Sequence, residues 1–108
     1  MNINSKSAQM RKGVLEFCIL SILKKREAYP SEILLQLKES NLIVVEGTLY
    51  PLLSRLKNEE LLAYRWEESK SGPPRKYYSL EKKGEVFLKE LESVWTEMVE
   101  TVNKITKY

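Results

Sequence analysis

The stretch VEGTLYPLLSRLK, residues 45–57, decides the fold of this 108-residue chain. Its apolar side chains follow the i, i+3, i+4, i+7 spacing of one helical face, at Leu49, Leu52, Leu53 and Leu56. This spacing predicts an amphipathic helix that packs on a core. The opposite side carries hydroxyls, one aromatic ring and two cations, from Thr48, Tyr50, Ser54, Arg55 and Lys57. Such groups contact phosphates and base edges, so the pattern indicates a helix that contacts nucleic acid.

Two helices are expected before this stretch. The apolar pattern of residues 8–26 predicts a first helix that contacts both the core and a second subunit. Its basic end, residues 24–26, fits the negative end of a helix dipole better than a DNA contact. Pro30 suits the first turn of a second helix, which should end near residues 40–41. Residues 42–45 are apolar and β-branched, which predicts a brief strand or an extended linker.

A β-hairpin should follow. Residues 62–67 and 75–80 are rich in aromatic side chains and predict two strands, joined by a flexible basic turn over residues 69–74. Trp66, Tyr77 and Tyr78 could stack single-stranded bases. Packing against the helices is the favoured interpretation, because a two-stranded hairpin is marginal alone and docks through such pairs.

A long helix over residues 81–107 is expected to mediate dimerisation. It carries two apolar lines, and one chain has too little body to cover both. The residues expected to form the dimer interface, or an effector pocket within it, are Phe87, Leu91, Val94, Trp95, Met98, Val99 and Val102. Trp95 would lie near its own symmetry mate. It is either a dimer-core residue or one wall of a slot for a planar aromatic ligand.

The composition argues against an enzyme. The chain contains no histidine, all 15 acidic residues are Glu, and Cys18 is the single cysteine. These absences remove His-based triads, disulfides within the chain and Cys or His metal sites, so no catalytic residue, metal or cofactor is expected. Cys18 lies in an apolar run and is expected to be a small core residue.

The charge and the hydropathy favour a cytoplasmic protein that meets nucleic acid. Net charge is +3, and residues 1–80 hold 13 Lys and Arg against nine Glu, which weakly supports a nucleic-acid partner. The longest apolar run is too short to cross a bilayer, and the N-terminus lacks a secretory signal. We therefore expect no membrane partner.

The motifs GTLYPLLSRLK and PPRKYYSL, residues 47–57 and 73–80, together resemble the signature of the PadR family of bacterial transcriptional regulators. With the flanking helices the resemblance covers nearly the whole chain. Helix pattern and resemblance agree on a mainly α fold with a small β-hairpin (α+β): a winged helix-turn-helix over residues 1–80 and a C-terminal dimerisation helix over residues 81–108.

The resemblance also implies a function. A homodimer would bind a double-stranded DNA operator and repress transcription until a signal molecule, here a small aromatic effector, binds. Thr48 and Arg55 are then expected to contact bases and Tyr50 a phosphate, while Lys70, Arg75 and Lys76 of the hairpin contact the backbone or the minor groove.

The chain departs from the family pattern at three places, and at the first it reads PSEI over residues 30–33 where the family often has Gly-Tyr-Glu-Ile. Glu60 stands where the family has a glycine suited to a left-handed helix cap, so strain of about 1 kcal/mol or a different cap is expected. Residues 80–84 read LEKKG where the family has Leu-Thr-x-x-Gly, which removes a Thr cap. The alternative function is a protein-interaction adaptor that uses the last helix as a coiled coil without binding DNA.

Overall fold

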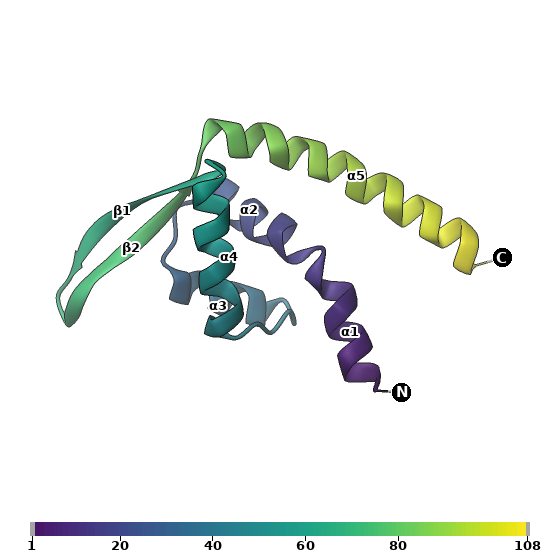
Figure 1. Ribbon diagram of the computed structural model, residues 1–108, viewed down its shortest axis with the longest axis horizontal. Helices are drawn as coiled ribbons and strands as arrows, with labels where there is room; N and C mark the ends of the chain where they lie inside the picture. The colour runs from purple at the N-terminus through teal and green to yellow at the C-terminus, as the bar shows by residue number, and fades with distance from the viewer. Residues whose placement is uncertain (1, 108) are drawn as a thin grey trace.

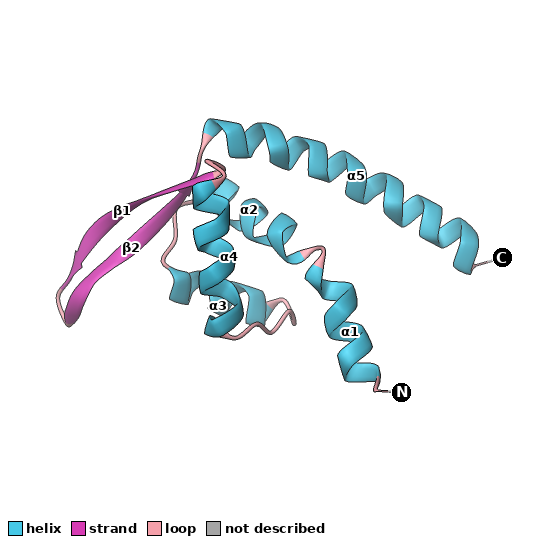
Figure 2. Ribbon diagram, viewed as in Figure 1, coloured by secondary structure: helices cyan, strands magenta, loops and turns pink. Residues whose placement is uncertain are grey.

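The fold is a small helical body with a projecting hairpin and a projecting final helix. Figure 1 shows a computed structural model of the chain, which describes residues 2–107. Its elements are α1 (Ile3–Lys12), α2 (Leu15–Lys25), α3 (Pro30–Glu39), α4 (Glu46–Asn58), β1 (Leu62–Ser69), β2 (Gly72–Leu80) and α5 (Lys82–Thr106). The two strands form one antiparallel pair (Figure 2), so the predicted α+β class is confirmed.

The single first helix predicted over residues 8–26 is wrong. The structure has two helices there, α1 and α2, separated at Gly13, and α1 begins earlier, at Ile3. The Val14 N–H donates to the Arg11 carbonyl oxygen at 3.0 Å, a tight turn in place of a continuing helix. Glycine costs about 1 kcal/mol relative to alanine inside a helix, so the break falls at the weakest position of the apolar pattern.

The core lies between α2, α3 and α4, and the hairpin and the start of α5 close it. The leucine stripe of α4 is confirmed, with Leu52 at its edge and the other three leucines fully buried. The buried residues of the hydrophobic core are Leu15, Ile19, Leu20, Leu23, Ala28, Ile33, Leu37, Leu49, Leu53, Leu56, Leu61, Leu62, Tyr78 and Leu88. Cys18 is half-buried and packs against this core, as expected.

The end of α4 has a left-handed cap. Glu60 has φ 66°, and the Leu61 N–H donates to the Leu56 carbonyl oxygen at 3.0 Å. This is the Schellman arrangement, in which the left-handed residue is most often glycine. Glu60 therefore forms the left-handed cap with a side chain that costs about 1 kcal/mol or more in that conformation. Asn41, also at φ 66°, ends α3 in the same way.

The hairpin is longer than predicted, and backbone hydrogen bonds join it to the loop before α3. β1 and β2 pair from Leu62 with Leu80 to Ser69 with Gly72, with an irregularity between residues 67 and 69. Ala28, in the loop before α3, exchanges two backbone hydrogen bonds with Tyr78, at 2.9 and 3.0 Å. The sequence did not predict this bridge. Residues 42–45 form the extended linker, not a strand.

The final helix extends well beyond the body. α5 was predicted over residues 81–107, and it spans Lys82–Thr106 with only Gly84 and Leu88 buried. Its C-terminal half and α1 project on the side opposite the hairpin (Figure 1). The radius of gyration is 15.7 Å, whereas a compact domain of this size would have about 13 Å. None of the helices described is both long and apolar enough to cross a membrane.

Candidate nucleic-acid interface

The outer side of α4 is a ridge flanked by two sets of polar side chains. Gly47, Pro51, Ser54 and Asn58 are exposed and lie opposite the leucine stripe. Pro51 lacks the N–H that would bond to the Gly47 carbonyl, yet α4 continues through it, as expected for a proline near the helix start. Of the predicted contact residues, Ser54 lies on this ridge. Asn58 was not predicted, although the helical spacing places it there.

The other predicted residues of α4 lie on its two flanks. Lys57 lies on the hairpin side, with its Nζ 5.7 Å from the centroid of the Tyr64 ring. Tyr50 lies on the same flank, near Tyr78. Thr48 lies on the opposite flank, where it lines a groove of about 570 Å³ with α1 and the linker over residues 42–45. The predicted contact residues thus share one helix but do not share one direction.

Arg55 is paired with carboxylates of the protein itself. Its Nη2 lies 2.7 Å from Glu16 Oε1 on α2, and its Nε lies 3.5 Å from Glu59 Oε1. The hydrogen bond and the charge of Glu16, with a smaller contribution from Glu59, raise the pKa of the guanidinium. Arg55 would have to leave Glu16 to reach a base edge. Glu16 was not singled out from the sequence, because the pairing depends on how α2 packs on α4.

The three predicted cations of the hairpin occupy different environments. Lys70 is exposed in the turn between β1 and β2. The Arg75 guanidinium lies 3.9 Å from the centroid of the Tyr29 ring, whereas Lys76 Nζ lies 4.5 Å from the Tyr64 ring. Arg75 and Lys76 are consecutive in a strand, so they point to opposite faces of the hairpin. Only Lys70 belongs to the turn itself.

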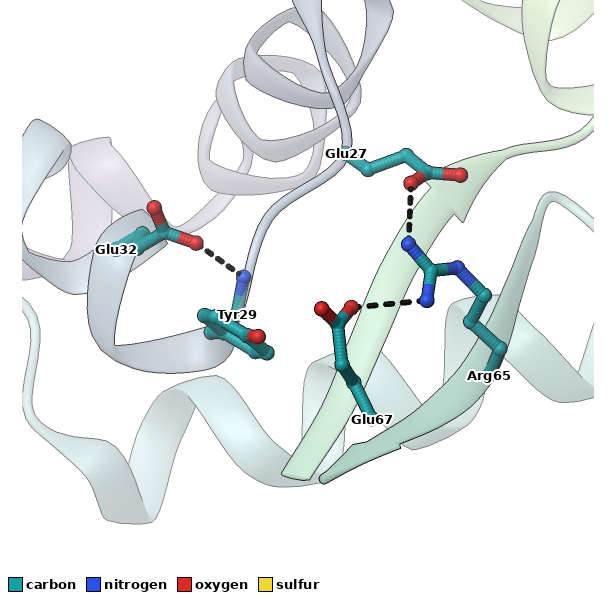
Figure 3. Close-up of polar contacts among 5 residues, drawn as sticks. All are labelled: Glu27, Tyr29, Glu32, Arg65 and Glu67. Carbon is teal, nitrogen blue, oxygen red and sulfur yellow. Dashed lines mark hydrogen bonds and ion pairs between the residues drawn. The ribbon is translucent and has the colours of Figure 1, made fainter. Parts of the chain in front are cut away.

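A polar network fixes the hairpin against the loop between α2 and α3 (Figure 3). Arg65 donates to Glu27 at 3.2 Å and to Glu67 at 2.8 Å, and these carboxylates raise the pKa of its guanidinium. Glu32 accepts a hydrogen bond from the Tyr29 N–H at 2.9 Å and so caps the start of α3. The hairpin is therefore oriented by side chains as well as by the backbone bridge at Ala28.

The aromatic residues of the hairpin do not form one platform. Tyr78 is buried, and its pKa is raised by that burial and then by the nearby phenols of Tyr64 and Tyr50. Tyr77 is half-buried, with its ring centroid 4.6 Å from that of Tyr29. The packing interpretation holds for these two rings. Trp66 differs, because 61% of it is exposed.

The predicted interface residues of α5 form a largely uncovered apolar surface. Trp95 is 42% exposed, and its ring centroid lies 6.3 Å from that of Phe17 on α2. Leu91 and Val99 are half-buried, and the exposed members are Phe87, Val94, Trp95, Met98 and Val102. Ile105 extends this surface toward the C-terminus. Trp95 thus contacts its own subunit on one side and leaves much of its indole uncovered.

The described residues lack the clusters that a metal site needs. No group of three or more Cys or Glu side chains within residues 2–107 could hold a metal ion. Burial raises the pKa of the Cys18 thiol, which disfavours the reactive thiolate.

The arrangement of α3, α4 and the adjoining hairpin defines a winged helix-turn-helix, a fold of DNA-binding regulators. Residues 19–90 match the Transcriptional regulator PadR-like family, and the chain belongs to this family. It is a DNA-binding transcription regulator, and the members of its family are not enzymes.

Solved structures of bacterial regulators are similar along nearly the whole chain. A PadR-like transcription factor from Bacteroides fragilis is 62% identical, with a TM-score of 0.80, over 94% of this chain and 99% of that one. A PadR family regulator from Eggerthella lenta is 33% identical, with a TM-score of 0.88, over 95% and 90%. A PadR-like regulator from Bacillus cereus is 40% identical, with a TM-score of 0.81, over 93% and 98%.

Proposed function

We propose that the protein is a homodimeric repressor that binds a double-stranded operator with α4 in the major groove and the hairpin on the flanking backbone. The observation that carries this proposal is the exposed ridge of α4, which lies beside a hairpin that is fixed in orientation. Helices of this fold enter the major groove, which is wide enough to admit them. In this arrangement residues 1–80 bind DNA and residues 81–108 pair the subunits.

Within α4, the contacts to DNA are proposed to come from Ser54 on the ridge and from the polar residues on the two flanks. Tyr50 and Lys57, on the hairpin side, suit the phosphate backbone, since a phenol and an ammonium both donate hydrogen bonds. Thr48 and Arg55, on the other flank, suit base edges. Arg55 would exchange its contact with Glu16 for a bidentate contact to guanine, the commonest specific contact in the major groove.

The proposed dimer rests on the uncovered surface of α5. Its apolar stripe runs for most of the helix, while the only buried residues of α5 are Gly84 and Leu88. Pairing of two such helices would remove the stripe from water. A two-fold dimer of this kind should bind half-sites that are about 10 base pairs apart, or a multiple of that spacing.

Effector response is proposed for the surroundings of Trp95. An indole that packs on Phe17 and stays partly exposed offers a flat aromatic wall, which suits planar aromatic cations through stacking and cation–π contacts. Such a compound acts as an inducer only if it binds the DNA-incompetent dimer more tightly. The test is a Trp66→Phe variant, in which Trp95 is the one remaining indole, titrated with planar aromatic cations. Quenching with no loss of DNA affinity would refute the regulatory role.

DNA binding is tested on genomic fragments. The purified protein is incubated with fragments of the genome that encodes it, and the recovered DNA is sequenced and then titrated by fluorescence anisotropy. We expect a palindromic site whose binding weakens steeply with salt. If the protein is an adaptor instead, no DNA site should be recovered and no salt-dependent DNA binding should be seen. Equal operator affinity of the wild type and a variant with both Tyr50→Phe and Arg55→Ala would refute the role of α4.

A further inference from the structure

The two faces of the hairpin carry different chemistry. Residues that pair directly across an antiparallel ladder share a face, and faces alternate along each strand. One face therefore carries the pairs of Leu62 with Leu80, Tyr64 with Tyr78, and Trp66 with Lys76. The other carries the pairs of Ala63 with Ser79, Arg65 with Tyr77, and Glu67 with Arg75. We call these the Trp66 face and the Arg65 face.

The Arg65 face is occupied by contacts within the protein. Arg65 bonds to two carboxylates, and its guanidinium also lies 4.7 Å from the centroid of the Tyr77 ring. Arg75 stacks on Tyr29 in the loop before α3. These cations have partners already, and their contacts orient the hairpin.

The six paired residues of the Trp66 face include one cation, Lys76, and three aromatic rings, but no carboxylate. Lys76 Nζ lies 5.5 Å from the Trp66 ring and 4.5 Å from the Tyr64 ring. The Tyr64 and Trp66 rings meet edge to face, with centroids 5.9 Å apart. Within residues 2–107, neither Lys76 nor Lys57 lies within 4 Å of a carboxylate oxygen. Their charges are therefore available to an anionic partner.

This face continues onto the hairpin flank of α4. Lys57 of α4 lies over the same Tyr64 ring that Lys76 approaches from β2. The two lysines therefore bracket Tyr64, and the exposed indole of Trp66 lies next to it, farther along the hairpin. A duplex that lies against the outer side of α4 would meet this face with its sugar–phosphate backbone.

We propose that Trp66 binds the deoxyribose–phosphate backbone of duplex DNA beside the groove that α4 enters, with Lys76 and Lys57 pairing the phosphates on either side. The indole covers a sugar with its ring and can donate its N–H to a phosphate oxygen. This assignment rests on the proposed function. It adds a contact that does not depend on the DNA sequence. It also gives the two neighbouring cations different roles, because Lys76 binds DNA whereas Arg75 orients the hairpin.

The test compares single variants on two duplexes, the operator and an unrelated sequence. Trp66→Ala should weaken binding to both by about tenfold, within the range that aromatic contacts to nucleic acid contribute. Because no charge is lost, the slope of log Kd against log salt should stay unchanged. Lys76→Ala should reduce that slope by about one unit. The matched control is Val86→Ala, which removes an equally exposed apolar side chain of α5, 62% against 61%, and should leave binding unchanged.

A second measurement uses the unmodified indole. Saturation of the wild-type protein with duplex should change its tryptophan fluorescence, and most of that change should vanish in Trp66→Phe, which retains Trp95. This readout holds even if Trp66→Ala folds poorly.

The outcomes separate this proposal from the proposed function. If the wild type binds its operator while Trp66→Ala binds equally well and Trp66 fluorescence does not change, the Trp66 contact is refuted and α4 keeps its role. A loss on the operator alone would overturn the backbone assignment in favour of a base contact. A shift of Trp66→Ala in sedimentation toward the monomer would assign Trp66 to the subunit interface instead. Absence of duplex binding by the wild type would overturn both proposals.

Discussion

Gly84, in the first turn of α5, should not tolerate even one added methyl group. A Cβ at this position would lie 2.6 Å from Leu80 Cδ1 and would overlap the Leu61 carbonyl oxygen. Carbon atoms pack at about 3.5 to 4.0 Å, so α5 would have to move by about 1 Å. The Leu61 oxygen also accepts the Glu81 N–H at 3.0 Å, and that bond would be strained by the movement.

The expected net effect of Gly84→Ala is a loss of about 1 to 3 kcal/mol in the free energy of unfolding. Overpacking costs about 1 to 3 kcal/mol and occasionally more. Disturbance of the hydrogen bond adds about 1 kcal/mol, while the better helix propensity of alanine returns about 1 kcal/mol. Each kcal/mol should lower Tm by about 4 to 8 °C in a domain of this size.

The assay is urea unfolding followed by circular dichroism, at one protomer concentration because subunit pairing contributes to apparent stability. Gly47→Ala is the matched control, since Gly47 also lies in the first turn of a helix but has no atom within 4 Å of an added Cβ. It should leave stability unchanged or raise it by about 0.4 to 1 kcal/mol. Equal stability of Gly84→Ala and the wild type would refute the packing argument.

Three further changes test the cap, the proposed dimer and the buried thiol. Glu60→Gly should stabilise the fold by about 0.5 to 1 kcal/mol in the same assay, because glycine adopts φ 66° without strain. Asn41→Gly should gain less, since Asn tolerates that region, and an equal gain would contradict the explanation. Met98→Glu should shift sedimentation toward the monomer by placing charges in the apolar stripe, whereas Ser93→Glu, exposed off that stripe, should not. Cys18 should react more slowly with iodoacetamide at neutral pH in the native protein than in urea, because its raised pKa keeps the thiol protonated. Equal rates by mass spectrometry would contradict the burial.

The sequence predicted elements whose evidence is local. The leucine spacing of α4, the aromatic strands and the apolar lines of α5 each lie within one segment. Each element appears at the expected place in the chain, although both strands are longer than predicted. The break at Gly13 was missed because the apolar pattern continues across it, so periodicity alone could not detect it. The bridge of Ala28 with Tyr78 was missed because it joins segments far apart in the sequence.

In the candidate site, too, the local features could be predicted from the sequence, whereas the features that depend on packing could not. Thr48, Tyr50, Ser54, Arg55 and Lys57 were assigned to α4 correctly, but the division into a ridge and two flanks depends on what packs beside the helix. The contact of Arg55 with Glu16 needs the orientation of α2, which no local pattern encodes. Arg75 and Lys76 are consecutive in β2 and therefore point to opposite faces of the hairpin. Only the strand register shows which of these faces meets Tyr29.

The position of α2 links the proposed DNA-binding surface of α4 to the proposed effector surface of α5. Glu16 and Phe17 are consecutive residues, and they contact Arg55 of α4 and Trp95 of α5 respectively. A ligand that parts Trp95 from Phe17 and an operator that draws Arg55 from Glu16 would therefore perturb the same turn of one helix. Linkage makes any such effect reciprocal: whatever factor the ligand imposes on DNA affinity, DNA imposes on ligand affinity. Through this turn of α2, a ligand bound at Trp95 would change the affinity of α4 for DNA, and bound DNA would change the affinity of the Trp95 surface for the ligand.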